Sequence, residues 1–470
     1  MLFLYDSLTL SFDLSYSMDM MDSSFIFKCY SSSSPSFFTV ARLLDLENFK
    51  SLVKKEEKEM NTGDTAWVLT STALVLLMTM PGLAFFYGGL VRRKNVLSIL
   101  MQCFIILAMI SLQWMLWGYS LTFGPDIKGI IGNLDWCALK GVGGAPNADY
   151  AATIPHSAFM IFQCMFAVIT PALMVGAYAE RMKFSAFLVF TILWATFVYD
   201  PLGHWVWGTG GWLKNLGALD FAGGIVVHTS SGVSALVLAI LLGKRVGTEN
   251  GITYKPHNMP FAILGAGLLW FGWFGFNAGS ALAANELAAN AFITTNTATA
   301  AAAFTWPMIE WIVGGRPTAL GCATGAVAGL VAITPACGFV TPINALFIGI
   351  LVSIFCYIAC AKIKAFFKYD DSLDVFGVHG VGGIWGTLAT GLFAEKVVNE
   401  AGADGLLFGN AHQFMIQCLL VVAAVIFAVV MTVIIFKLVD AVIGMRVEKK
   451  AELVGLDLTQ HSESGYTLIE

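Results

Sequence analysis

Long blocks of apolar residues, separated by short polar connections, run through the chain from Met60 onward. Several blocks hold at least about 18 residues with almost no charge, which is the length that an α-helix needs to cross a bilayer. The pattern predicts an all-α polytopic membrane protein with eleven transmembrane helices, at about residues 65–90, 96–122, 154–179, 184–206, 222–243, 261–282, 287–312, 317–334, 341–361, 375–394 and 413–438.

Composition agrees with a membrane protein. The chain is 57% hydrophobic and 12% charged, with a mean hydropathy of +0.75, whereas soluble domains carry about 25% charged residues. Its 47 glycines suit the close helix–helix contacts that form in lipid. The sequence has no basic stripe of the kind that binds nucleic acid, so we do not expect nucleic acid as a partner. The nine cysteines show no metal-binding spacing, so we expect neither a metal site nor a cofactor.

Residues 1–59 differ from the rest of the chain. They hold Ser-rich stretches, scattered Asp and a charged run at 54–59. A secretory signal would need a basic region, an apolar region and a small-residue cleavage site, and this order is missing. We interpret 1–59 as an extra segment, either disordered or the product of an upstream start codon. The membrane domain is then expected at 60–440 and a tail at 441–470.

Positive charges in the connections predict the orientation. Alternate connections, beginning with the one that holds residues 92–94, carry twelve Lys and Arg, and the intervening ones carry four. Because Lys and Arg are enriched in cytoplasmic loops, the first set is expected in the cytoplasm. The amino end then lies outside and the carboxyl end inside, which fits an odd number of spans in a plasma membrane.

The spans also suggest an internal repeat. Spans one to five and six to ten would form two halves inserted in opposite directions, with one extra helix, and such inverted repeats place the substrate path between the halves. The last helix of each half contains one intramembrane histidine, His228 or His379, in a Gly-rich segment that begins with Asp220 or Asp374.

Two histidines at equivalent depth favour a functional pair. The alternative for each is a buried neutral ring that bonds a backbone carbonyl. Ionisable side chains in a membrane usually face a path or a partner, and paired imidazoles offer both a donor and an acceptor to a small polar molecule. We therefore expect His228 and His379 to line a path.

Aromatic residues form a second candidate site. Trp207 stands at the outer end of span four, and Phe166 and Phe276 lie in spans three and six. Aromatic faces can hold a cation with about 0.5–2 kcal/mol per contact. Membrane aromatics are more commonly packing or interface residues. Asp220 could cap the following helix, and this alternative is compatible with attraction of a cation.

Five segments together resemble the Amt branch of the Amt/Mep/Rh family of ammonium transporters. They are FFYGGLVRRKN at 85–95, GAYAER at 176–181, LDFAGGIVVH at 219–228, GWFGFNAGS at 272–280 and DVFGVHG at 374–380. The resemblance covers about residues 62–470. It implies a homotrimer, with one conduction path in each subunit, and a cytoplasmic regulatory tail that bears on PII-type signalling proteins.

The resemblance also implies roles for individual residues. The outer ammonium site would be formed by Trp207, Phe166, Ser280 and Asp220. Phe166 and Phe276 resemble the stacked phenyl gate below that site, and His228 and His379 resemble the family's twin-histidine pair.

The sequence thus predicts a transporter rather than an enzyme. NH4+ would be captured at the outer aromatic site and deprotonated, and NH3 would pass the two histidines. The proton either stays outside or crosses separately through the histidines, and both routes fit the sequence. Two alternatives from other classes are a redox protein whose histidines ligate a haem and an ammonium sensor in which binding, rather than flux, is the function.

Overall fold

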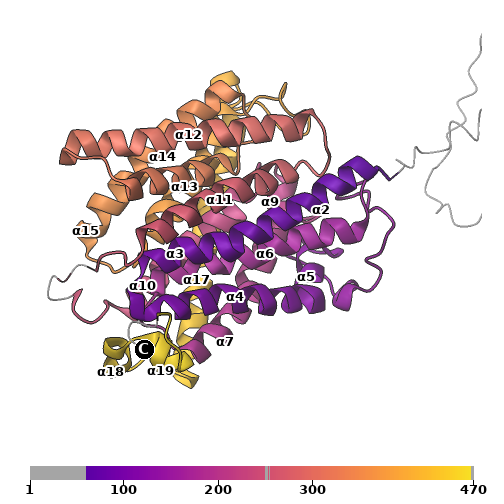
Figure 1. Cartoon of the computed structure of the whole chain (residues 1–470). Coiled ribbons are helices and arrows are strands. Elements are labelled where there is room, and N and C mark those ends of the chain that lie inside the picture. The colour runs from indigo at the N-terminus through magenta and orange to yellow at the C-terminus, as the bar shows by residue number, and fades with distance from the viewer. Residues whose placement is uncertain (1–59, 249–251, 253, 467–470) are drawn as a thin grey trace, which may run out of the picture. The chain divides into compact units, whose positions relative to one another are not determined.

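The computed structural model describes residues 60–248, 252 and 254–466. Residues 1–59, interpreted above as an extra segment, lie outside this range. The described part is mostly helical (Figure 1).

The first half of the membrane domain contains five helical segments, some interrupted by π-helical or 3-10 turns, and one short hairpin. In chain order these are α2 (Thr62–Leu77), η1 (Met78–Leu83), α3 (Ala84–Leu90), η2 (Arg93–Asn95), α4 (Val96–Gln113), η3 (Trp114–Gly118), α5 (Tyr119–Phe123), β1 (Asp126–Ile127), β2 (Ile131–Gly132), η4 (Cys137–Leu139), α6 (His156–Tyr178), α7 (Phe184–Trp194), η5 (Ala195–Tyr199), α8 (Asp200–Trp207), α9 (Trp212–Asn215), η6 (Gly224–Thr229) and α10 (Ser230–Leu242).

The second half and the tail are also built from helices. The elements are α11 (Met259–Gly279), α12 (Glu286–Gly314), α13 (Ala319–Ile333), α14 (Pro342–Ile358), η8 (Ala359–Ile363), α15 (Lys364–Phe367), η9 (Phe376–Gly380), α16 (Val381–Phe393), η10 (Leu406–Phe408), α17 (Ala411–Val442), α18 (Lys449–Val454) and α19 (Leu456–His461). Asparagine side chains cap four of the long helices by accepting a backbone N–H of the first turn, at Asn61, Asn258, Asn285 and Asn410.

A helical segment occupies each of the eleven positions predicted from the sequence, but only some have the composition of a membrane span. Among the described residues, eight helices are long and apolar enough to cross a bilayer. Helix α12 has 29 residues but is diluted by Thr and Asn. Helix α13 has 15 and is about 22 Å long, and α16 has only 13 residues. The number eleven therefore stays a prediction.

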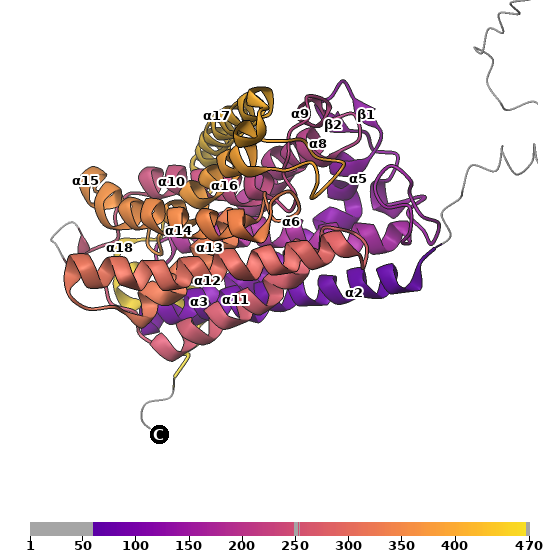
Figure 2. The ribbon, with the colours of Figure 1, turned by 90° about the horizontal axis from the view of Figure 1, so that it is seen from above.

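The long helices pack side by side as a bundle (Figure 2). Helix α11 lies against α2 and α3, and α12 packs on α13 and α14. Helix α6 is the most enclosed of the long helices, since nearly all its residues from Phe162 to Tyr178 are buried. It contacts α2, α4 and α10 and so forms the centre around which the site is built.

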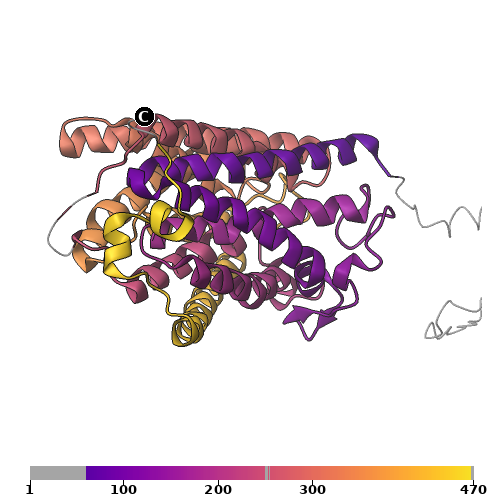
Figure 3. The ribbon, with the colours of Figure 1, turned by 60° about the horizontal axis from the view of Figure 1, so that its bottom comes forward.

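The two ends of the bundle differ. Helices α18 and α19 of the tail lie at the end where α4 begins (Figures 1 and 3). Asn95 accepts the N–H of Leu456 at 2.7 Å, and Asp457 accepts the N–H of Ser98 at 2.8 Å. The antiparallel strands β1 and β2 lie near α8 and α9 at the other end (Figure 2).

Candidate functional site

The two histidines occupy equivalent local structures and contact each other. His228 lies in the π-helical turn η6 that begins α10, and His379 lies in the π-helical turn η9 that begins α16. Their Nδ1 atoms are 3.3 Å apart, so one ring donates a hydrogen bond to the other. Both side chains are buried. No described residue offers a hydrogen-bond partner to Nε2 of His228, which leaves one polar atom available to a molecule passing the pair.

Glycines bring the two histidine helices together. A Cβ atom placed on Gly232 of α10 would lie 2.1 Å from the nitrogen of Gly380 and 2.4 Å from its Cα. A Cβ on Gly383 would lie 2.7 Å from the carbonyl oxygen of Gly224. Backbones can approach this closely only where neither helix carries a side chain. The Gly-rich surroundings of the histidines thus have a structural cause.

The ring of His228 has a fixed orientation. It stacks on Trp273 of α11, with ring centres 5.2 Å apart and an interplanar angle of 15°. The indole N–H of Trp273 donates to Oγ1 of Thr334 at 2.9 Å. Because a buried hydrogen bond anchors the indole, the imidazole stacked on it is held in place as well.

A row of rings leads from the histidines to one end of the bundle. Phe166 of α6 and Phe276 of α11 stack with centres 4.2 Å apart at 16°. Phe276 lies 6.1 Å from His228, and Phe166 lies 6.1 Å from Trp207, edge to face. Consecutive rings from Trp207 through Phe166, Phe276 and His228 to His379 are therefore neighbours.

The outer member of this row faces a cavity of about 400 Å³, which we call the aromatic cavity. Among its lining residues are Phe166, Trp207, Asp220, Ser280, Lys214 and Tyr150. The four residues expected to form an ammonium site thus lie around one cavity, with Phe276 stacked directly beneath Phe166.

The polar groups of this cavity are partly used by the protein itself. The Asp220 carboxylate accepts four backbone N–H groups, from Gly223, Gly224, Ile225 and Val226, at 2.6–3.2 Å. The aspartate therefore caps η6, as the capping alternative anticipated, and any effect of its charge on a cation is exerted at a distance. The Ser280 hydroxyl donates to the carbonyl of Phe276 at 2.9 Å, which leaves its oxygen lone pairs available.

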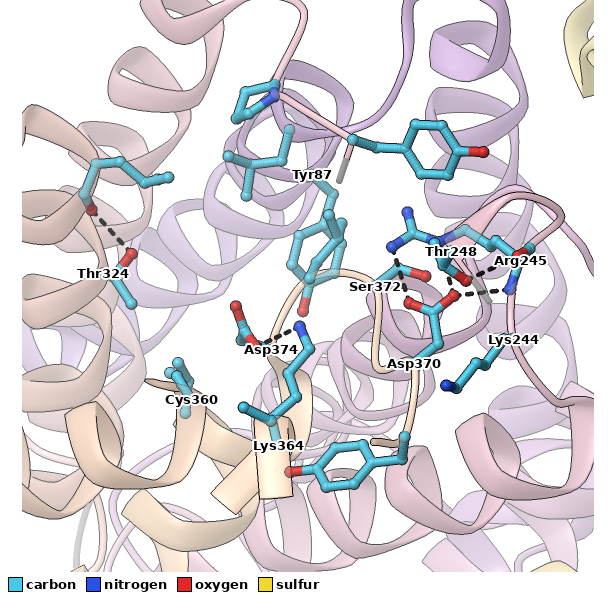
Figure 4. A pocket seen from close by; sticks show the side chains of 18 of the residues that line it. Tyr87, Lys244, Arg245, Thr248, Thr324, Cys360, Lys364, Asp370, Ser372 and Asp374 are labelled. Atoms are coloured by element: carbon cyan, nitrogen blue, oxygen red, sulfur yellow. Dashed lines mark hydrogen bonds and ion pairs between the residues drawn. The ribbon is translucent and has the colours of Figure 1, made fainter. Parts of the chain in front are cut away.

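A second cavity lies on the far side of the histidine pair. It has a volume of about 550 Å³, and His379 and Val378 are among its lining residues. Several cations also line it, among them Lys244, Arg245 and Lys364 (Figure 4), and we call it the lysine cavity. Lys364 points to Asp374, with 2.7 Å between Nζ and Oδ1. Lys244 and Lys368 are solvent-exposed.

An ionic network borders the lysine cavity. Arg245 contacts Asp370 through three N–H groups at 2.8–3.0 Å and Glu180 at 3.2 Å. The Glu180 carboxylate also accepts a hydrogen bond from Nε of Arg92, with 2.8 Å between Nε and Oε2. Burial acts to raise the pKa of Asp370, but the hydrogen bonds and charge of Arg245 outweigh it and lower the pKa to about 2. Asp370 thus stays ionised, and the network fixes this rim.

Sequence reasoning did not single out this rim. Lys364 and Arg245 entered only as charges that set the orientation, and Glu180 only as part of a motif. A usable signal was present, because Lys364 continues an apolar span and an ionisable residue there calls for a partner. The partner, Asp374, lies ten residues further along the chain.

The histidines do not fit the haem alternative. Two imidazoles that ligate one iron lie on opposite faces of the porphyrin, with their nitrogens roughly 4 Å apart, twice a metal–imidazole bond of about 2 Å. The 3.3 Å contact between the Nδ1 atoms is instead a direct hydrogen bond. The two imidazoles stack with centres 5.4 Å apart, and Trp273 stacks on His228 at 5.2 Å, so no macrocycle fits between these rings.

Residues 66–466, nearly all of the described chain, match the Ammonium Transporter Family. The chain belongs to this family. It is 53% identical over 407 residues to the ammonium transporter of Bacillus subtilis (strain 168), covering 87% of this chain and 99% of that protein.

Solved structures agree with this assignment to the ammonium transporter family. The crystal structure of Candida albicans Mep2 matches with a TM-score of 0.80 and 35% identity, over 87% of this chain and 94% of that one. A structure described as a sensor Amt protein matches with a TM-score of 0.78 and 32% identity, over 85% of this chain and 98% of that one. The chain is thus a multi-pass membrane transporter of ammonium and not an enzyme.

Proposed function

We propose that this transporter captures NH4+ in the aromatic cavity, removes a proton there, and conducts NH3 between Phe166 and Phe276 and past His228 and His379 into the lysine cavity. The main observation that supports this proposal is the uninterrupted row of rings between the two cavities. It supports a narrow path that is apolar except for the imidazole nitrogens.

The chemistry of this path explains selection between ions of similar size and charge. An isolated charge is very costly to bury without a partner. Ammonium can lose its charge by losing a proton, whereas potassium cannot. An apolar constriction therefore passes the species that becomes neutral. The proton either remains on the side of capture or crosses separately along the bonded histidines, and measurement of charge per ammonium distinguishes the two routes.

The two ends of the bundle support an assignment of sides. The end with the tail and the lysine cavity carries Lys244, Arg245, Lys364 and Lys368, and positive residues favour the cytoplasm. The aromatic cavity then faces outward from a plasma membrane. We also propose a homotrimer with one path in each subunit, and a PII-type protein as the partner that would dock at the cytoplasmic end, beside α18 and α19.

Flux through purified protein in liposomes tests the function. An inward ammonium gradient should produce uptake that protein-free liposomes lack, and a potassium gradient of equal size should not. Labelled methylammonium that binds the protein without entering the vesicles would instead favour the sensor alternative, and absence of both binding and flux would contradict the proposal.

Removing one half of the phenyl stack should alter selectivity. Phe166→Ala deletes the ring that stacks on Phe276 at 4.2 Å, so water can follow the cation further and the desolvation barrier falls. We expect ammonium flux to change by about tenfold or potassium exclusion to weaken, since about 1.4 kcal/mol in a barrier is a factor of ten. Phe187→Ala is the matched control, because this buried ring lines neither cavity. If both variants have the same ammonium flux and the same potassium exclusion, Phe166 is only a packing residue.

Labelling tests the orientation. Lys450 is exposed in α18 and Asp135 is exposed in the connection after β2. In a background with Cys29, Cys137 and Cys322 replaced by serine, a membrane-impermeant maleimide on intact cells should label Asp135→Cys strongly and Lys450→Cys only after permeabilisation. Labelling of Lys450→Cys on intact cells would reverse the assignment of sides.

A further inference from the structure

Lys214 places a positive charge in the cavity that we assign to cation capture. It lies in α9, its side chain lines the aromatic cavity, and its Nζ donates to the carbonyl oxygen of Trp207 at 2.9 Å. The same nitrogen lies 5.5 Å from the centre of the Tyr150 ring. A fixed cation beside a site for a free cation calls for an explanation, although the Asp149 carboxylate lines the same cavity and offsets part of this charge.

The contacts of Lys214 are those that an ammonium ion would make. A lysine headgroup is a compact cation with three N–H donors, which makes it a tethered analogue of NH4+. A carbonyl oxygen accepts one N–H, and a ring face within about 6 Å attracts the charge. The carbonyl of Trp207 and the Tyr150 ring thus form an ammonium-type position that the protein fills with its own side chain.

The surroundings hold this position in place. Tyr150 stacks on Phe159, with ring centres 5.1 Å apart at 15°, and its hydroxyl donates to the carbonyl of Phe123 at 2.7 Å. The indole of Trp207 donates to the carbonyl of Asp220 at 2.9 Å. Both partners of Lys214 are therefore anchored independently of the lysine, so they would remain in place if the lysine were shortened or made neutral.

We propose that Lys214 sets the affinity of the capture site, by occupying one ammonium-type position and by repelling the cation that enters the same cavity. This inference rests on the proposed function of the aromatic cavity. At an effective dielectric constant between that of bulk water and that of a protein surface, two unit charges about 8 Å apart interact by roughly 0.7–1.4 kcal/mol, which changes an equilibrium constant about three- to tenfold. The lysine would keep capture weak, so that the bound cation moves on rather than remaining at the mouth.

Concentration-dependent uptake in proteoliposomes tests the proposal. Lys214→Met keeps the length and apolar stem of the side chain but removes the charge, and we expect the KM for ammonium to fall about three- to tenfold with the maximal rate within about twofold. Lys214→Arg keeps the charge, and its KM should stay near that of the wild type. Lys140→Met removes an exposed charge that does not line the cavity and should leave KM unchanged.

Ionic strength supplies a second readout that a purely structural lysine would not affect. Salt screens the repulsion, so the wild-type KM should fall as salt rises, and that of Lys214→Met should change much less. An unchanged KM in Lys214→Met, or a loss of maximal rate shared by the Met and Arg variants, would overturn the inference. Failure of the wild type to transport at all would instead count against the proposed function.

Discussion

A potassium gradient across liposomes that contain His228→Asp is expected to drive a current that the wild type does not carry. The wild-type path offers a potassium ion only imidazole nitrogens and ring faces, and the two Nδ1 nitrogens already bond each other at 3.3 Å. A carboxylate in this position would provide a fixed negative charge and two oxygen ligands at the point where an ion is least solvated.

The size of the effect follows from the cost of burying an unpaired ion, which is several kcal/mol even after relaxation. A partial offset of about 1.4–2.8 kcal/mol raises a rate by one to two orders of magnitude. We therefore expect potassium conduction to increase by roughly ten- to a hundredfold. Ammonium transport should fall, because the carboxylate can hold the cation and neither stacks on Trp273 nor offers Nε2.

His228→Asn separates charge from shape. Asparagine has nearly the size of aspartate and loses the same ring contacts, with 5.2 Å to Trp273 and 5.4 Å to His379, but it adds no charge. It should reduce ammonium flux without admitting potassium. If both variants exclude potassium and move ammonium at the wild-type rate, the histidine pair is structural and the proposed path is wrong.

The histidines of the candidate site could be predicted from the sequence because ionisable side chains are uncommon inside a membrane. His228 and His379 stand out because an ionisable ring in an apolar span is costly, and a family resemblance implied the positions of Trp207, Phe166 and Phe276. The structure shows that these five rings are consecutive neighbours.

Other features could not be read from hydropathy because they depend on contacts between distant segments. The π-helical turns at both histidines leave no trace in an apolar pattern. The network of Arg92, Glu180, Arg245 and Asp370 joins four connections that are far apart in the chain. Helix α13 is a different case, because hydropathy alone predicts more than the structure shows. Its apolar run predicts a span, yet its 15 residues are fewer than the roughly 20 that a helix needs to cross a bilayer.

Replacing Gly232 by alanine is expected to disable transport although it adds a single methyl group. The new Cβ would lie 2.1 Å from the nitrogen and 2.4 Å from the Cα of Gly380, and a backbone cannot move aside as the end of a side chain can. Helices α10 and η9 would have to separate by about 1 Å or more to reach ordinary van der Waals contact. His379 would move with η9, and the 3.3 Å contact between the histidines would lengthen beyond hydrogen-bond range.

Overpacking of this kind costs about 1–3 kcal/mol or more, so the purified variant should lose thermal stability, and we expect ammonium flux to fall by at least about tenfold. Gly267→Ala is the matched control, because this helical glycine of α11 has open space where a Cβ would lie and alanine favours a helix by about 1 kcal/mol. The control should fold and transport like the wild type. Wild-type flux in Gly232→Ala would show that α10 and η9 can separate without consequence, and that the close glycine crossing does not position the histidines.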